Sequence, residues 1–193
     1  ARFEAPLSAL GPVRLELVER RRSGLWNELI DRYHYLGYKP LPGAQLRYFA
    51  SAGERLVAVL GFGAAAWQTA PRDAWIGWSQ AQRRRNLAAV VNNARFLILP
   101  WIRVPHLASK LLALAARTLP AHWQARYGYR PVLLETFVEA ERFSGTCYQA
   151  ANWVYVGDTQ GRGKLGDHRL GQVPVKTVWL YPLVADCRAR LCR

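Results

Sequence analysis

The stretch that decides the fold is Asn93-Ala-Arg-Phe-Leu-Ile-Leu-Pro-Trp-Ile-Arg-Val-Pro-His-Leu-Ala-Ser109. Its first part predicts a short apolar strand at Arg95–Leu99, ended by a proline that cannot donate a hydrogen bond to a sheet. Pro105 is a favourable first residue of a helix, and apolar side chains then recur at three- and four-residue steps. We expect Pro120 to break this helix and a second piece to end at Gly128. The pattern is a strand that leads into a long helix.

The sequence on both sides of this stretch adds further strands and helices. The predicted elements are a helix at Ser23–Leu36, a hairpin of Gln45–Ser51 and Leu56–Phe62, a capped helix from Ser79 to about Asn92, a strand at Val132–Val138, a short helix at Gly145–Asn152, and strands at Trp153–Gly157 and Val175–Tyr181. Strands that alternate with helices indicate an α/β fold with a single mixed central sheet flanked by helices. We expect one domain over residues 1–193, with a basic loop at about 158–173 and a basic C-terminal tail from about 184.

Charge and composition limit the class of function. The chain has 27 Lys and Arg against 13 Asp and Glu, so its formal net charge is +14. A domain this basic is typical of proteins that bind a polyanion or an anionic cofactor. The composition excludes collagen, coiled-coil and low-complexity proteins. The apolar run Leu56–Trp67 is much shorter than the roughly 20 residues of a membrane-spanning helix, so we expect no membrane partner.

Neither the cysteines nor the carboxylates form a recognisable metal motif. The chain has three cysteines, Cys147, Cys187 and Cys192, so they cannot all pair with one another. Only the spacing of the last two loosely resembles that of zinc ligands. We therefore expect reduced thiols and a cytoplasmic protein. The acidic residues show no tight cluster of the kind that two-metal nucleases need, and the sequence names no cofactor.

The order of elements resembles the GCN5-related N-acetyltransferase fold, in which a central strand leads into a helix whose N-terminus holds a pyrophosphate. The resemblance implies an acetyltransferase-like layer order. It also makes Arg103, His106 and Ser109 candidate anion-binding residues at the corresponding turn. That turn has no Gly to let backbone N–H groups approach a phosphate, and Pro105 lacks an N–H. We therefore expect no acetyl-CoA binding tighter than about 100 µM, roughly −5.5 kcal/mol.

A second, narrower resemblance rests on local motifs that extend from about Pro6 to Leu183. The motifs are Tyr33-His-Tyr-Leu-Gly-Tyr38, Trp75-Ile-Gly-Trp78, Asn93-Ala-Arg-Phe-Leu-Ile-Leu-Pro-Trp101, Leu107-Ala-Ser109, Leu134-Glu-Thr-Phe-Val138, Gly145-Thr-Cys-Tyr148, Ala150-Ala-Asn-Trp153 and Gly157-Asp-Thr-Gln-Gly-Arg-Gly163. Together they resemble the DruA-type proteins of the Druantia anti-phage system and their transposon-linked relatives. This resemblance implies phage defence or mobile-element biology, with other defence-system or transposon proteins as partners. It implies no particular reaction.

Three residues are candidates for catalysis, and each has a structural alternative. His34 could act as a general base, or it could end a helix within an aromatic cluster. Glu135 interrupts an apolar strand, so it either faces a cleft as a base or pairs with a buried arginine such as Arg95 or Arg47. The acetyltransferase resemblance implies that Tyr148 is a general acid, and the alternative is core packing.

Arginine clusters provide the candidate nucleic-acid-binding residues. A guanidinium group can bind two phosphate oxygens at once through paired N–H donors. Glycines next to such arginines let the backbone come close to the phosphate. The alternative is a solvated basic surface. The candidates are Arg83, Arg84, Arg85, Arg162, Lys164 and Arg169.

These residues support a nucleic-acid-binding, DNA-processing protein as the leading hypothesis, with DNA favoured over RNA. Two alternatives stay open. One is an acyl-CoA- or aminoacyl-dependent transferase that modifies nucleic acid or protein, and the other is a non-catalytic recognition module.

Overall fold

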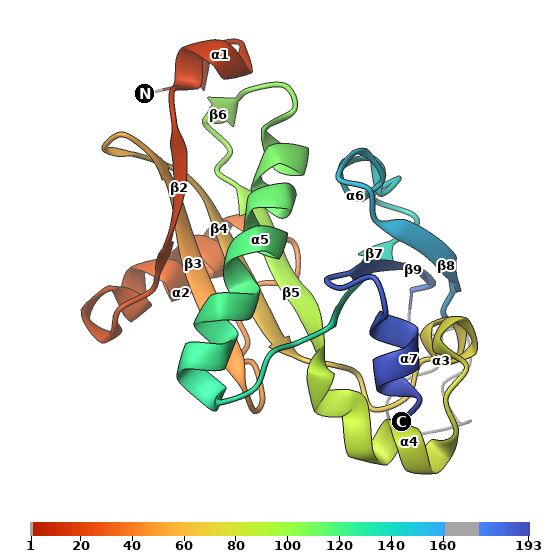
Figure 1. Cartoon of the computed structure of the whole chain (residues 1–193). Coiled ribbons are helices and arrows are strands. Elements are labelled where there is room, and N and C mark those ends of the chain that lie inside the picture. Colours follow the sequence, from red (N-terminus) through yellow and green to blue (C-terminus); the bar gives the residue numbers. More distant parts are fainter. Residues whose placement is uncertain (1, 161–173) are drawn as a thin grey trace. The chain divides into compact units, whose positions relative to one another are not determined.

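The computed structural model describes residues 2–160 and 174–193, and the chain divides into two compact units (Figure 1). Unit 1 comprises Ala1–Ala64 and Asn93–Gly128, and unit 2 comprises Ala65–Asn92 and Tyr129–Arg193. Each unit contains its own strands and helices. Most of the predicted basic loop at about 158–173 lies outside the described residues.

Unit 1 is built on the antiparallel strands β2 (Val13–Leu17), β3 (Gln45–Ala52) and β4 (Arg55–Ala64), with β5 (Val90–Ile98) following β4 in the sheet. The β3–β4 hairpin turns at Gly53, whose φ of 58° is easy for glycine and strained for other residues. The predicted hairpin is confirmed, and both strands are slightly longer than the apolar pattern indicated.

The two main helices of unit 1 cover opposite faces of its sheet. They are α2 (Ser23–Tyr33) and α5 (Leu107–Tyr127) (Figure 1). Neighbouring residues of a strand point to opposite faces. On β3, Arg47 lies against Trp26 of α2. The next residue, Tyr48, stacks on His122 of α5 with ring centroids 5.8 Å apart. The unit is therefore a helix–sheet–helix sandwich.

Helix α5 continues without interruption through Pro120, so the predicted break there is wrong. A proline inside a helix removes one backbone hydrogen bond and costs about 3 kcal/mol. Here the proline is itself buried, as are Leu119 and Trp123, and burial of this face offsets the cost. The helix ends as predicted at Gly128, whose φ is 80° and whose N–H bonds to Gln124.

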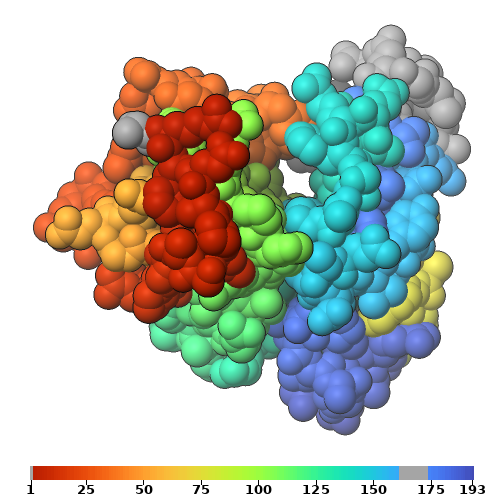
Figure 2. All heavy atoms as spheres, turned by 90° about the horizontal axis from the view of Figure 1, so that it is seen from above, coloured from red at the N-terminus to blue at the C-terminus, as the bar shows by residue number. Residues whose placement is uncertain are grey.

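The N-terminal segment of unit 1 packs beside the turn before α5. Strand β1 (Phe3–Glu4) pairs in parallel with β6 (Ile102–Arg103). In Figure 2 the red N-terminal segment accordingly lies against the green segment around residue 102. A short helix α1 (Leu7–Leu10) follows β1, and a 3-10 turn η1 (Arg20–Arg22) leads into α2. The sequence patterns did not predict these short elements.

Unit 2 contains β7 (Leu133–Glu139), β9 (Lys176–Pro182) and β8 (Val154–Asp158), joined by antiparallel ladders in that order. Residues 90–92 of β5 pair in parallel with β7. These three strands were predicted to within two residues at each end.

Four short helices accompany these strands. They are α3 (Ala70–Ile76), α4 (Gln80–Asn86), α6 (Thr146–Ala150) and α7 (Cys187–Leu191), and a 3-10 turn η2 (Leu87–Ala89) follows α4. The predicted capping box of α4 is present, with Ser79 and Gln82 exchanging hydrogen bonds. The helix ends earlier than expected, because Val90 and Val91 join β5.

The hydrophobic core of unit 2 includes both α3 and the C-terminal segment. Its buried members are Ile76, Trp78, Val90, Val132, Leu133, Val178, Leu180, Cys187 and Leu191. The segment predicted as a basic tail therefore forms helix α7 and contributes apolar side chains to this core. In Figure 2 the blue C-terminal segment and the yellow segment of α3 lie side by side.

The strands follow the order β2-β3-β4-β5-β7-β9-β8, a mixed central sheet flanked by helices, as predicted. Strand β5 belongs partly to each unit. None of the helices in the described part of the chain is both long and apolar enough to cross a membrane.

Candidate functional site

One face of the unit 1 sheet carries two arginines with an indole between them. Arg47 of β3 lies opposite Gly61 of β4 in the ladder. A Cβ atom on Gly61 would lie 3.0 Å from the Trp26 ring and 3.3 Å from the Cβ atom of Arg95 on β5. The Cζ atom of Arg47 lies 5.3 Å from the centroid of the Trp26 ring, within the range of a cation–π contact. Because Gly61 has no side chain, the indole reaches the sheet at this position, next to the guanidinium of Arg47. We call Arg47 and Arg95 the α2-face arginines.

The α2-face arginines form no ion pair with any described carboxylate. Arg47 donates to two neutral oxygens, Oδ1 of Asn27 and Oγ of Ser23, each at 2.8 Å. Arg95 donates to the carbonyl oxygen of its neighbour Ala94 at 2.7 Å, and its buried Nε has no hydrogen-bond partner. Burial lowers the pKa of Arg95 below its usual value. Half-buried cations without a neighbouring anion suit a negatively charged ligand.

His34 lies at the C-terminal end of α2 and feels the charge of Arg95. Burial and that charge lower the pKa of His34 from 6.5 to about 4, so the imidazole is neutral at pH 7. Its Nδ1 accepts a hydrogen bond from the N–H of Leu36 at 3.2 Å, and its ring stacks on Tyr35 at 4.9 Å. The proton of the neutral ring is therefore on Nε2. In this state His34 is a hydrogen-bond donor, which fits an anion better than the expected role as a general base.

Glu135 belongs to a buried ion-pair network in unit 2. The side chains of Glu135 and Arg72 are both 0% exposed, and their Oε2 and Nη1 atoms are 2.8 Å apart. The other carboxylate oxygen of Glu135 accepts the N–H of Ala66 at 2.8 Å. Arg72 also pairs with Asp73 at 2.9 Å, and Asp73 pairs with Arg83 at 3.1 Å. Burial raises the pKa of Glu135, and the charge of Arg72 opposes that rise.

This network supports the structural alternative for Glu135. Both carboxylate oxygens are hydrogen-bonded and neither is exposed, so a substrate has no route to them in this arrangement. The buried arginine that pairs with it is Arg72, and not Arg95 or Arg47 as the sequence suggested.

Tyr148 lies on the other side of β7 from Glu135. The hydroxyl of Thr136 donates to the Tyr148 hydroxyl at 3.4 Å, and the tyrosine ring packs on Trp153 with centroids 5.0 Å apart. Thr136 follows Glu135 directly on the strand, so the two side chains point to opposite faces of the sheet. Glu135 and Tyr148 therefore lie on opposite faces of the sheet and do not form one catalytic site. His34 belongs to unit 1 and these two residues to unit 2.

Helices α4 and α7 form an arginine-rich surface on unit 2. The end of α7 is held against α4, where Asn86 Nδ2 donates to the Leu191 carbonyl oxygen at 2.9 Å. Figure 1 shows the two helices side by side. We define the α4–α7 arginine surface by its exposed cations, Arg84, Arg85, Arg188, Arg190 and Arg193.

The contacts of this surface leave most of its charge available. Arg188 lies over the ring of Trp75 at 5.4 Å. Arg85 donates to the carbonyl oxygen of Arg193 at 2.9 Å. Arg190 is the member that pairs with a carboxylate, Asp186, at 2.9 Å and with both side chains half exposed. Such an exposed pair contributes little to stability.

The other predicted phosphate-binding residues behave differently. Arg83 points inward: it is 8% exposed, pairs with Asp73 and lies over Trp67, so it does not add to the exposed charge. The remaining predicted residues, Arg162, Lys164 and Arg169, lie outside the described residues.

The candidate anion-binding residues of the turn before α5 are exposed or half-buried. Arg103 is exposed on β6. His106 is the residue before the first turn of α5 and has a left-handed φ of 64°, which is uncommon for a residue with a side chain. The hydroxyl of Ser109 donates back to the carbonyl oxygen of His106 at 3.1 Å. The turn therefore achieves without glycine the backbone conformation that glycine usually adopts.

Within residues 2–160 and 174–193, no group of three or more His, Cys, Asp or Glu side chains is arranged to hold a metal ion. The three cysteines are free thiols.

Solved structures with similar folds are N-acetyltransferases. The chain is similar to the dodecameric spermidine N-acetyltransferase from Vibrio cholerae, with 12% identity over 89% of this chain and 94% of that chain and a TM-score of 0.55. It is also similar to the ribosomal-protein-S18-alanine N-acetyltransferase from Escherichia coli, with 9% identity, 89% and 94% coverage and a TM-score of 0.52. A probable acetyltransferase from Staphylococcus epidermidis has 8% identity, 90% and 100% coverage and a TM-score of 0.55. At these identities the likeness establishes the fold, which is that of the GCN5-related N-acetyltransferases, as predicted.

The family is narrower than the fold. The model of the family described as Druantia protein DruA matches residues 3–170, which is most of the chain. The chain therefore belongs to the DruA family, and this membership indicates a role in anti-phage defence. A search of curated proteins gives no match.

Sequence reasoning missed several residues of these sites. Arg72 and Asp73 were overlooked because the short helix α3 was not predicted. Arg47 was considered only as a partner for Glu135. The signal for its position was present in the hairpin, because the ladder that places Arg47 opposite Gly61 follows from the turn at Gly53.

Proposed function

We propose that this chain binds nucleic acid, with DNA favoured over RNA, and that the α4–α7 arginine surface contacts the phosphate backbone. The observation that carries the proposal is the exposure of five arginines within one unit, four on the helices α4 and α7 that pack against each other and Arg193 just after α7. Among the described residues, Arg190 is the member of this set that pairs with a carboxylate. Membership of a defence family supports it, because phage nucleic acid is an accessible target of such a system.

Arginine is well suited to this contact. Its planar guanidinium presents paired N–H donors that match phosphate oxygens, and its charge does not depend on pH in the physiological range. Each neutralised phosphate releases bound counterions, so affinity falls steeply with salt. For about four contacts, the affinity should fall roughly 10²-fold between 50 and 200 mM salt. Trp75, under Arg188, adds an aromatic surface to the same site.

The test is a fluorescence-anisotropy titration of labelled duplex DNA, single-stranded DNA and RNA over a series of salt concentrations. The test variant is Arg84→Ala with Arg188→Ala. The matched control is Arg14→Ala with Arg117→Ala, which removes the same charge from exposed positions on β2 and α5 of unit 1. Thermal melting of each variant checks folding.

We expect the test variant to bind all sequences more weakly and to have a salt slope smaller by about 2. The control should keep the wild-type slope. If both variants lose affinity equally, the interaction is with the overall charge and the assignment to α4 and α7 is wrong. Wild-type protein that fails to bind at 50 mM salt overturns the proposal itself.

Acyl transfer is the second candidate, and the fold favours it, since the structural neighbours are N-acetyltransferases. The glycine-free turn at His106 argues against a conventional pyrophosphate grip. Calorimetry with acetyl-CoA separates the two candidates. We expect no binding tighter than about 100 µM. Micromolar binding would make an acyl-CoA-dependent transferase of nucleic acid or protein the leading function. Nucleic-acid binding without any turnover would support a recognition module.

A further inference from the structure

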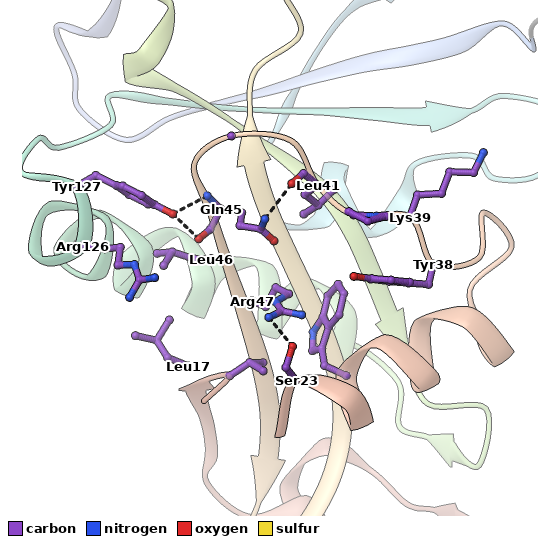
Figure 3. A pocket seen from close by; sticks show the side chains of 14 residues that line it. Leu17, Ser23, Tyr38, Lys39, Leu41, Gln45, Leu46, Arg47, Arg126 and Tyr127 are labelled. Carbon is purple, nitrogen blue, oxygen red and sulfur yellow. Dashed lines mark hydrogen bonds between the residues drawn. The ribbon is translucent and has the colours of Figure 1, made fainter. Parts of the chain in front are cut away.

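Unit 1 contains a pocket of about 500 Å³ at the end of the sheet where β3 begins (Figure 3). Its walls come from the start of α2, the loop that follows α2, the first residues of β3 and the last residues of α5. Pockets of 300–1,000 Å³ are typical of small-molecule sites. This volume suits a single small molecule and is too small for a duplex.

Hydrogen bonds between distant segments hold the walls in place. The hydroxyl of Tyr127, on α5, accepts the N–H of Gln45 at 2.7 Å and donates to the Gln45 carbonyl oxygen at 2.8 Å. The Gln45 side chain donates to the Leu41 carbonyl oxygen at 2.9 Å. Figure 3 shows these contacts as a chain across one side of the pocket. The pocket is therefore formed before a ligand arrives, which lowers the entropy cost of binding.

The charge of the pocket is entirely positive. None of the fourteen described residues that line it is acidic, and three of them are Lys39, Arg47 and Arg126. The ammonium of Lys39 points away from the other labelled side chains in Figure 3, so the two arginines are the relevant cations. Arg47 donates to Ser23 and Asn27, which are both neutral, so these contacts place no opposing charge beside it. A half-buried guanidinium held by neutral acceptors is suited to bind an anion.

The rest of the lining is aromatic and apolar. The Tyr38 hydroxyl points into the pocket in Figure 3, and Leu41 and Leu46 contribute to the walls. Arg47 itself packs over the ring of Trp26, which fixes the plane of its guanidinium. A ligand that fits has an anionic group for Arg47 and a planar, less polar part for Tyr38 and the leucines.

We propose that this pocket binds a nucleoside phosphate, either as a free mononucleotide or as the phosphorylated end of a strand. The phosphate would contact Arg47, whose fork of N–H groups matches its oxygens, and the base would lie on Tyr38. The site belongs to unit 1 and the α4–α7 arginine surface belongs to unit 2. This proposal rests on residues other than those of the proposed function. An experiment can therefore overturn either one while the other stands.

The test is calorimetry with purified protein and three sets of probes. The first set is the four deoxynucleoside 5′-monophosphates, and the second is the same nucleosides without phosphate. The third is a 5′-phosphorylated trinucleotide and its unphosphorylated form. Inorganic phosphate alone measures the contribution of the anion. The variants are Arg47→Gln and Arg47→Lys, Tyr38→Ala, and the control Arg117→Gln, an exposed arginine of the same unit.

We expect mononucleotides to bind at least tenfold more tightly than nucleosides or inorganic phosphate. Arg47→Gln and Tyr38→Ala should each weaken binding at least tenfold, with Arg47→Lys intermediate and the control unchanged. A phosphorylated trinucleotide that binds more tightly than the mononucleotide identifies a strand end as the ligand, and the opposite order identifies a free nucleotide. The proposal is overturned if nucleosides bind as well as nucleotides, if no probe binds, or if Arg47→Gln melts like wild type and binds equally well.

Discussion

The fully buried Arg72 of unit 2 and the α2-face arginines of unit 1 differ in what neutralises them. Arg72 is 0% exposed and contacts two carboxylates, those of Glu135 and Asp73. Arg47 and Arg95 are half-buried, and they donate hydrogen bonds to neutral oxygens of Asn27, Ser23 and Ala94. The same side chain is thus fully compensated in one region and uncompensated in the other.

This difference in neutralisation distinguishes an arginine that stabilises the fold from arginines that are suited to bind a ligand. A fully desolvated cation is tolerated when carboxylates and hydrogen bonds surround it, so Arg72 and Glu135 stabilise each other. A half-buried cation still exchanges with water, and an arriving anion can replace that water. By this reasoning the pair of Glu135 and Arg72 in unit 2 has a structural role, because it joins β7 of the sheet to α3. The α2-face arginines of unit 1 are available for a ligand.

The largest effect that this comparison predicts is for Glu135→Gln. The change keeps the shape and removes the charge that faces Arg72 in a site with no exposure. We expect a loss of about 3 kcal/mol in the free energy of unfolding, or a Tm lower by roughly 6–12 °C. Chemical denaturation measures it, with the exposed Glu141→Gln as the control.

A double variant decides whether the loss comes from charge. Arg72→Met with Glu135→Leu removes both partners and should recover much of the stability, because the uncompensated charge is gone. Wild-type stability in Glu135→Gln, together with lost function, would instead return Glu135 to the list of catalytic residues.

A smaller effect is expected for Gly61→Ala, which tests the arrangement of the α2-face arginines. The new methyl group would lie 3.0 Å from the Trp26 ring and 3.3 Å from the Cβ atom of Arg95. We expect a loss of about 1–2 kcal/mol as the indole shifts. The control is Gly24→Ala, because a Cβ atom at this position has no other atom within 4 Å. This substitution should slightly stabilise α2, since alanine favours a helix more than glycine does. Similar stability of the two variants would mean that Trp26 does not need the glycine.

The elements that the sequence predicted well are those with a local cause. The hairpin, the capping box of α4 and the end of α5 at Gly128 depend on turn and cap residues within a few positions. The end of α4 was misjudged because Val90 and Val91 are withdrawn from the helix by pairing with β7, a contact about 40 residues away. The break at Pro120 failed for a similar reason, since packing of the whole helix outweighed one local rule.

The candidate sites were predictable in residue type but not in geometry. The sequence identified His34, Glu135 and Tyr148 as unusual, and each does have a specific environment. Glu135 of β7 pairs with Arg72 of α3, and Tyr148 of α6 contacts Thr136 on the other face of β7. These contacts join separate elements, and no local pattern predicts them. The partner of Glu135 was unpredictable because Arg72 lies on a short helix with a proline near its start.

The smallest predicted effect is the contribution of His34 to the pH dependence of stability. In the folded chain the pKa of His34 is about 4, and in the unfolded chain it returns to about 6.5, so the unfolded state binds the proton more tightly. Stability from this residue is therefore complete above about pH 6.5 and is lost as the pH falls toward 4. Because the ring is partly exposed and screened by solvent, we expect about 1 kcal/mol or less between pH 7 and 5. Denaturant titrations at both pH values measure the change, and the His34→Gln variant should lose this part of the pH dependence.

The Arg95→Gln variant should raise the pKa of His34 in an NMR titration, because the charge of Arg95 is one of the two causes that lower this pKa. A histidine that titrates near 6.5 in the folded wild type would show that neither burial nor Arg95 acts on it, and the α2 face would then lack its neutral N–H donor below that pH.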